Sequence, residues 1–181
     1  LVTSLALITA ALPIHLKFYG LCIGFALEAV ILAYAGRQYE RAILQFSSLT
    51  ALTLAGLTLL ARLPLHELEF IPVFNRPFGS WLVVIASCFT VSHLQQKWMD
   101  KDSEWGKYIY RIPLLLGVAL TGLLLHCEVQ SYWKVQQIAQ GIETAPMWET
   151  TSLIILWTII ALALAETGHR LNNIFCIPIS C

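Results

Sequence analysis

Long runs without a charged residue constrain this chain more than any other feature. The uncharged runs are residues 42–61 and 77–96, each of 20 residues, and residues 112–127 and 150–165, each of 16 residues. A fifth run, 18–36, is interrupted only by Glu28. A helix that crosses the hydrocarbon core of a bilayer needs roughly 17–25 mostly apolar residues, and the shorter runs reach this length when flanking side chains extend to the headgroups. Because backbone groups cannot stay unpaired in lipid, such runs are expected to be helices.

The composition excludes a soluble protein with the same helices buried inside it. Only 12% of the 181 residues are charged and 57% are hydrophobic, whereas a soluble domain has about 25% charged residues. A membrane β-barrel is disfavoured because the runs are too long and lack the alternation of a barrel wall. The eleven basic and eleven acidic residues cancel, which excludes an electrostatic nucleic-acid binder, so no nucleic-acid partner is expected.

The runs predict an all-α protein, a polytopic transmembrane helical bundle of about six spans whose first span is partial. The spans are predicted near residues 1–12, 18–36, 43–61, 78–95, 111–127 and 150–167. They form one transmembrane domain over residues 1–173, followed by a tail at 174–181 that a truncation would explain. The chain begins at Leu1 within an apolar run that lacks the features of a signal peptide. We therefore expect it to be a fragment of a longer protein.

Basic residues predict which connections face the cytoplasm. With alternate connections assigned to one side, seven Lys and Arg residues lie on one side and four on the other. The seven are Arg37, Arg41, Lys97, Lys101, Lys107, Arg111 and Arg170. Cytoplasmic loops carry the excess of basic residues, so the connections with these seven are expected inside. On the outer side, the proline-rich segment 62–78 is expected to lie in the interface or between helices, and segment 129–142 to form a short interfacial helix.

Glu28 is the one charge in the middle of a predicted span, and an acid at this depth is a functional candidate by default. Gly20, Gly24 and Glu28 follow at four-residue steps and share one helix face. A Gly-x-x-x-Gly pair lets another helix approach closely, so Gly20 and Gly24 are predicted to form a packing face. The candidate hydrogen-bond partners of Glu28 are Thr53, Ser87 and Thr90. Two readings stay open, namely a protonated acid that fixes helix packing and a site for a proton or cation.

An outer polar cluster is the other candidate site. Its members are His66, Glu67, Glu69, His126 and Glu128. Consecutive helical residues point about 100° apart, so His126, Cys127 and Glu128 cannot hold one ion without help from the loop. Neither a P-loop nor a GxGxxG, HExxH or GxSxG pattern occurs, so we predict no catalytic residue, metal or cofactor. Cys22, Cys88 and Cys127 lie in or at apolar runs, where cysteines are small packing residues.

Four segments carry a resemblance to a known family. They are FALEAVILAYAGRQYER (25–41), PVFNRPFGSWLVVIA (72–86), LLHCEVQSYW (124–133) and SLIILWTIIALALAETGHR (152–170). In their order and spacing, over most of residues 10–173, the chain resembles a bacterial membrane-protein family catalogued as domain of unknown function 2339. The resemblance implies a long inner-membrane protein with many spans and recurring helix pairs. It implies no activity and no catalytic residue, and the tail after Asn173 departs from the family pattern.

The sequence therefore predicts a multi-pass protein of the inner (plasma) membrane without enzymatic activity, most simply a structural or assembly component of the bacterial cell envelope. Its expected partners are the lipid bilayer and the remaining spans of a longer parent chain or other membrane subunits. A transporter or channel that uses Glu28 is the alternative, although a transport path usually needs several polar groups at one depth. A third class, an enzyme acting on lipid-linked substrates, would need the outer polar cluster.

Overall fold

The computed structural model of the chain describes residues 18–61, 76–99, 110–140 and 145–175. Its helices are α2 (Phe18–Gln38), α3 (Ala42–Leu60), α4 (Arg76–Met99), α6 (Arg111–Gln140) and α7 (Ala145–Phe175). The described part contains no strand, and all five helices are long and apolar enough to cross a membrane. The prediction of an all-α protein with membrane-spanning helices is therefore confirmed. The partial span predicted near 1–12 and the tail at 174–181 lie wholly or mostly outside the described residues, and the sixth span stays a prediction.

The helices α2, α3 and α4 begin and end close to the predicted bounds, whereas α6 and α7 are much longer than predicted. The helix α6 continues for 30 residues, so the segment predicted as a short interfacial helix at 129–142 is largely the carboxyl-terminal end of α6. No glycine or proline occurs between Leu123 and Gln140, so nothing interrupts the backbone hydrogen bonding after Glu128. A charged residue indicates where a helix leaves the lipid. The backbone hydrogen bonds of the helix can continue beyond that residue.

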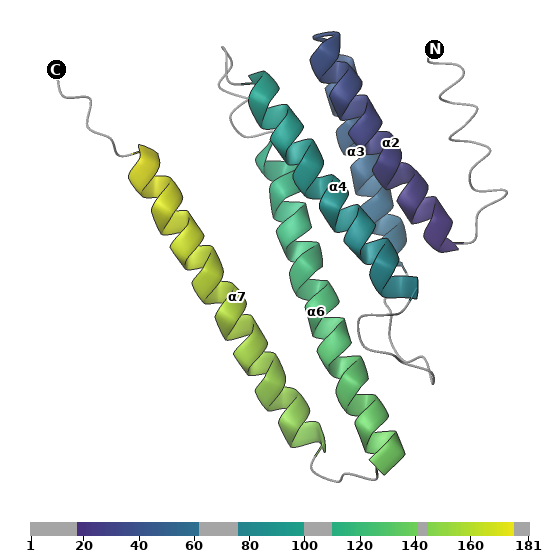
Figure 1. The fold of residues 1–181 in the computed structure, drawn as a ribbon, viewed down its shortest axis with the longest axis vertical. Coiled ribbons are helices and arrows are strands. Elements are labelled where there is room, and N and C mark those ends of the chain that lie inside the picture. Colours follow the sequence, from purple (N-terminus) through teal and green to yellow (C-terminus); the bar gives the residue numbers. More distant parts are fainter. Residues whose placement is uncertain (1–17, 62–75, 100–109, 141–144, 176–181) are drawn as a thin grey trace.

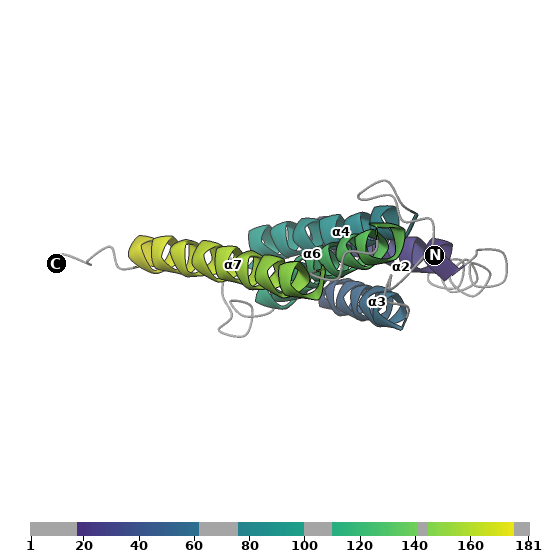
Figure 2. The same ribbon diagram turned by 90° about the horizontal axis from the view of Figure 1, so that it is seen from below.

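Helices that follow one another in the chain run in opposite directions, and α2, α3, α4 and α6 pack together (Figure 1). The helix α2 lies against both α3 and α4, and α6 lies mainly against α4. Among the described helices, α7 contacts α6 alone. It extends from α6 on the side away from α2 and α3, as the view along the bundle shows (Figure 2). The described helices thus form a four-helix unit with one further helix attached to its side.

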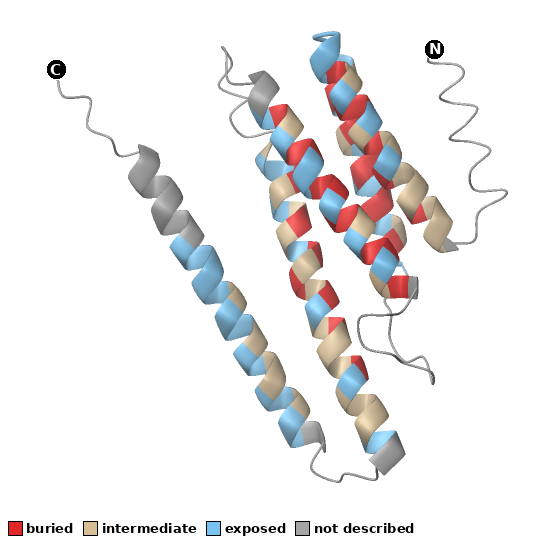
Figure 3. Cartoon of the chain, viewed as in Figure 1, coloured by how far each residue is buried: buried red, intermediate tan, exposed pale blue. Residues whose placement is uncertain are grey.

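Small residues bring α2 close to its neighbours. The buried residues of α2 are Cys22, Ala26, Ala29, Leu32, Ala33 and Gly36 (Figure 3). Because all of them except Leu32 are small, the backbone of α2 can approach α3 and α4, which is how membrane helices gain van der Waals contact when lipid offers no hydrophobic driving force. Cys88 and Cys127 are buried as well, so the burial expected of the three cysteines is confirmed.

The turn between α2 and α3 is short and closed by backbone hydrogen bonds. Tyr39 N donates to Ala35 O at 2.9 Å, and Arg41 N donates to Gly36 O at 3.1 Å. Glu40 completes the turn with a φ of 52°, a left-handed conformation in which glycine is the usual residue. This turn fixes α2 and α3 as an antiparallel pair.

Candidate functional site

Glu28 lies at the margin of the packed face of α2. At about 100° per residue, it points about 120° away from Cys22, which is in the middle of that face. Gly20 and Gly24 point still further from Cys22, each by about 160° but on opposite sides of it. Gly20, Gly24 and Glu28 are all half-buried. One carboxyl oxygen of Glu28, Oε2, is buried. The two glycines therefore face away from α3 and α4, and their contact with another helix stays a prediction.

The hydroxyls predicted as partners of Glu28 are used within their own helices. The three bonds, each of 2.8 Å, run from Thr53 Oγ1 to Thr50 O, from Ser87 Oγ to Val83 O and from Thr90 Oγ1 to Ala86 O. A hydroxyl has one proton to donate, so none of these groups donates to the Glu28 carboxyl, and a bond from a protonated Glu28 to one of them stays a prediction. Serine and threonine inside a helix bond readily to the carbonyl three or four residues earlier.

Two glutamines that we had not singled out from the sequence are buried between α2, α3 and α4. The side chains of Gln45 and Gln95 are 1% and 0% exposed. Gln45 Nε2 donates to the Ala33 carbonyl of α2 at 3.1 Å, and Gln95 Nε2 donates to Ser48 Oγ at 3.3 Å. Ser48 Oγ donates to the Gln45 carbonyl at 2.7 Å. One neutral polar network therefore connects three helices near the end at which α2 is joined to α3.

A sequence signal for this network exists. Gln45 and Ser48 are three residues apart in the uncharged run 42–61, so they share a helix face. In lipid, two polar side chains on one face need partners on a neighbouring helix. The Oε1 atoms of Gln45 and Gln95 are buried and accept no hydrogen bond from the described residues. No donor of the network bonds to these two oxygens, and all the side chains of the network are uncharged.

The outer polar cluster is described only in part. His126 is half-buried on α6, and its Nδ1 accepts a hydrogen bond of 3.3 Å from Trp157 Nε1 of α7. Glu128 is two residues further on and points about 200° round the helix, so the two side chains face different neighbours. His66, Glu67 and Glu69 lie outside the described residues, and their approach to His126 and Glu128 stays a prediction. Within the described ranges, no three His, Cys, Asp or Glu residues are grouped to hold a metal ion.

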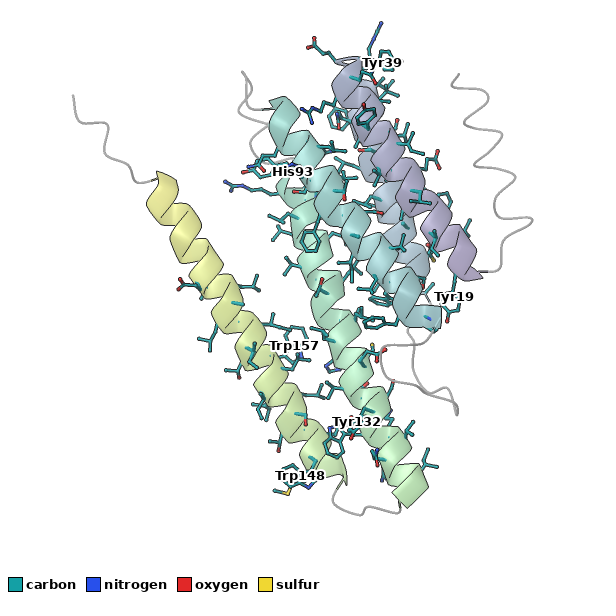
Figure 4. All side chains as sticks on the ribbon, viewed as in Figure 1. Tyr19, Tyr39, His93, Tyr132, Trp148 and Trp157 are labelled. Carbon is teal, nitrogen blue, oxygen red and sulfur yellow. The ribbon has the colours of Figure 1, made fainter. Side chains whose placement is uncertain are left out.

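Two tryptophans connect α6 and α7. Trp157 extends from α7 toward α6 (Figure 4), and a Cβ atom added to Gly122 would lie 3.4 Å from its ring. Glycine at position 122 thus leaves room for the indole. Closer to the α6–α7 connection, Trp133 Nε1 of α6 donates to Ser152 Oγ of α7 at 3.1 Å. Sequence reasoning had treated His126 and Trp157 separately, because nothing in the spacing of two different helices indicates which residues meet.

The face of α7 that carries Trp157 borders an open groove of about 760 Å³. Its lining residues are Thr150, Leu153, Ile154, Trp157, Thr158, Ala161, Leu162 and Ala165. They recur at three- and four-residue steps and therefore lie along one side of α7. This surface is mostly apolar and, in a membrane, available to lipid or to another helix.

Comparison of the chain with protein-family models, with curated proteins and with solved structures finds no match. The resemblance to domain of unknown function 2339 therefore stays a prediction.

Proposed function

We propose that this chain is a structural or assembly component of the bacterial cell envelope, without enzymatic activity. On this proposal it is embedded in the inner membrane by about six spans, with residues 1–12 in the first, as part of a longer chain or complex. The observation that supports the proposal is the exposure of α7. None of its membrane span, Met147–Glu166, is buried, and α7 contacts only α6 among the described helices.

The exposed half of α7 has the character of a helix-packing surface. Beyond Ile160, every described side chain of α7 is exposed. Ala161 and Ala165 are four residues apart on the groove face, and small residues at this spacing let membrane helices approach each other closely. The proposed occupants of this surface are further spans of a longer parent chain or other membrane subunits.

Site-specific photocrosslinking in bacterial membranes tests the proposal. A photoreactive phenylalanine derivative at Ala161 or Ala165 should give a discrete protein adduct, because a partner helix is expected within a few ångströms. The same probe at Leu57, an exposed residue of α3, is the matched control and should react with lipid only. Lipid adducts alone at both α7 positions would contradict an assembly role for this surface.

A transporter or channel is the second candidate, and the observation that favours it is the half-buried carboxyl of Glu28 within the span of α2. The buried glutamine network lies at another depth, since Gln45 bonds to Ala33, more than one helical turn from Glu28. A transport path usually needs several polar groups at one depth. For this reason we favour the structural role.

Substitution of Glu28 separates the two candidates. If Glu28 fixes packing, Glu28→Gln should leave both folded yield and cellular phenotype unchanged, because the amide keeps a donor and an acceptor. Glu28→Leu should then weaken helix association by about 1–2 kcal/mol, the scale of interhelical hydrogen bonds in membranes. A Gln variant that folds normally but loses its function in cells would favour transport of a proton or cation instead.

A further inference from the structure

The hydrogen bond between Trp157 and His126 requires a neutral imidazole. An indole N–H can only donate, so the Nδ1 atom of His126 must carry a lone pair to accept it at 3.3 Å. The imidazole is then neutral, with its proton on Nε2. An imidazolium has N–H groups at both positions and no acceptor. Protonation of His126 is therefore incompatible with this contact.

No other charged group of the described helices replaces Trp157 as a partner for His126. The described titratable side chains on the helices that pack here are Cys88 and His93 on α4, Glu149 and Glu166 on α7, and Arg111, Cys127, Glu128, Tyr132 and Lys134 on α6. The helix α3 has none. Cys88 packs against Gly117, about 13 Å along α6 from His126, and the two glutamates of α7 are about 12 Å or more along α7 from Trp157. Cys127 and Glu128 point about 100° and 200° away from His126 on its own helix.

The contact is also important to α7. Among the hydrogen bonds between side chains of α6 and α7 are those from Trp157 to His126 and from Trp133 to Ser152. The second joins the helices near their connection, whereas the first lies further along α7, just before the stretch 161–166 in which every residue is exposed. Loss of the Trp157 bond would therefore weaken the attachment of α7 to α6 at the end of their contact that is far from the connection.

We propose that the Trp157–His126 hydrogen bond makes the attachment of α7 to α6 sensitive to acid. At neutral pH, His126 accepts the indole proton and α7 packs on α6 as far as Ile160. When His126 takes up a proton, two N–H groups face each other, the contact is lost and the part of α7 around Trp157 separates from α6. His126 is about 22 Å along α6 from Arg111, close to the outer boundary of a hydrocarbon core of about 30 Å, so the proton would come from the outer side.

Fluorine NMR of the full chain labelled with 5-fluorotryptophan, in detergent micelles, tests this proposal. The six tryptophans give one resonance each, and Trp157→Phe and Trp133→Phe identify the two of interest. Between pH 8 and pH 5, the Trp157 resonance should shift in a single step and narrow, because the indole loses its acceptor and becomes more mobile. The Trp133 resonance is the internal control and should stay constant, since its acceptor, the Ser152 hydroxyl, does not titrate in this range.

The variant His126→Gln supplies the matched control. Its side-chain oxygen can accept the indole proton but does not titrate, so its Trp157 resonance should be constant from pH 8 to pH 5. A Trp157 resonance in the wild-type chain that does not move, or that moves without narrowing, would overturn the proposal. An equal shift in His126→Gln would overturn it as well. The result for the wild-type chain can be obtained whether or not the His126→Gln variant folds.

Discussion

The tight packing at Gly36, between α2 and α3, gives the sharpest prediction about stability. A Cβ atom added at Gly36 of α2 would lie 2.9 Å from Nε2, 3.0 Å from Cδ and 3.1 Å from Cγ of Gln45 on α3. Gly36→Ala therefore requires the Gln45 side chain to move. At a protein surface such a flexible side chain would move at little cost. Here it is 1% exposed and bonded to the Ala33 carbonyl, so the movement breaks a buried hydrogen bond.

The expected loss of stability follows from three terms. A buried donor that loses its partner costs about 1–3 kcal/mol, although interhelical bonds in membranes lie toward the lower end of this range. Crowding of a packed interface adds about 1–3 kcal/mol. Alanine recovers up to about 1 kcal/mol through its higher helix propensity. Gly36→Ala should therefore lower the free energy of unfolding by about 1–3 kcal/mol.

Unfolding by SDS titration in mixed micelles, followed by far-UV circular dichroism, measures this loss. Gly79→Ala is the matched control, because an added Cβ there meets nothing within 4 Å, and its unfolding free energy should be unchanged or higher. The double variant Gly36→Ala/Gln45→Ala removes the clashing side chain, so Gly36→Ala should cost little in that background. A Gly36→Ala protein as stable as the Gly79→Ala protein would refute the reasoning.

Three further predictions concern the same bundle and its orientation. Glu40→Gly should raise the free energy of unfolding by about 0.5–1 kcal/mol, because glycine adopts the φ of 52° without steric cost; a lower SDS midpoint would contradict this. Ser48→Ala should cost about 1 kcal/mol in the same titration because it removes a link of the buried network, whereas exposed Ser47→Ala should stay within about 0.5 kcal/mol. In intact cells, a membrane-impermeant thiol reagent should label Gln137→Cys but reach Gln38→Cys only after permeabilisation; the reverse pattern would invert the orientation and leave the spans intact.

The spans of α2, α3 and α4 could be predicted from the sequence because each is bounded by charged residues that leave the lipid. This criterion locates the limits of the hydrocarbon layer and says nothing about helix continuation beyond it. For that reason α6 and α7 were predicted too short. The helix α6 continues through Glu128 and Lys134, whose side chains tolerate the interface and whose backbones remain helical.

The candidate sites were predictable only as residue types. Glu28 was identified because a charge within an apolar run is conspicuous, but its expected hydroxyl partners bond within their own helices. The Gln45–Gln95 network and the Trp157–His126 bond depend on which faces of different helices meet. Neither the spacing of residues within one span nor the composition of a loop contains that information. The bonding partners of these residues therefore depend on hydrogen bonds within each helix and on which helices pair. The pattern of residues within a single span does not predict either.

The two kinds of helix contact in this protein predict different behaviour in a membrane. Lipid is as apolar as leucine, so helices associate through close packing and hydrogen bonds rather than through burial of apolar surface. The helix α2 has both, with a face of small residues against its neighbours and the bond from Gln45 to its backbone. The helix α7 has two tryptophan hydrogen bonds and the space at Gly122, and none of its described residues is fully buried. Its position should therefore depend far more than that of α2 on what occupies the groove beside Trp157.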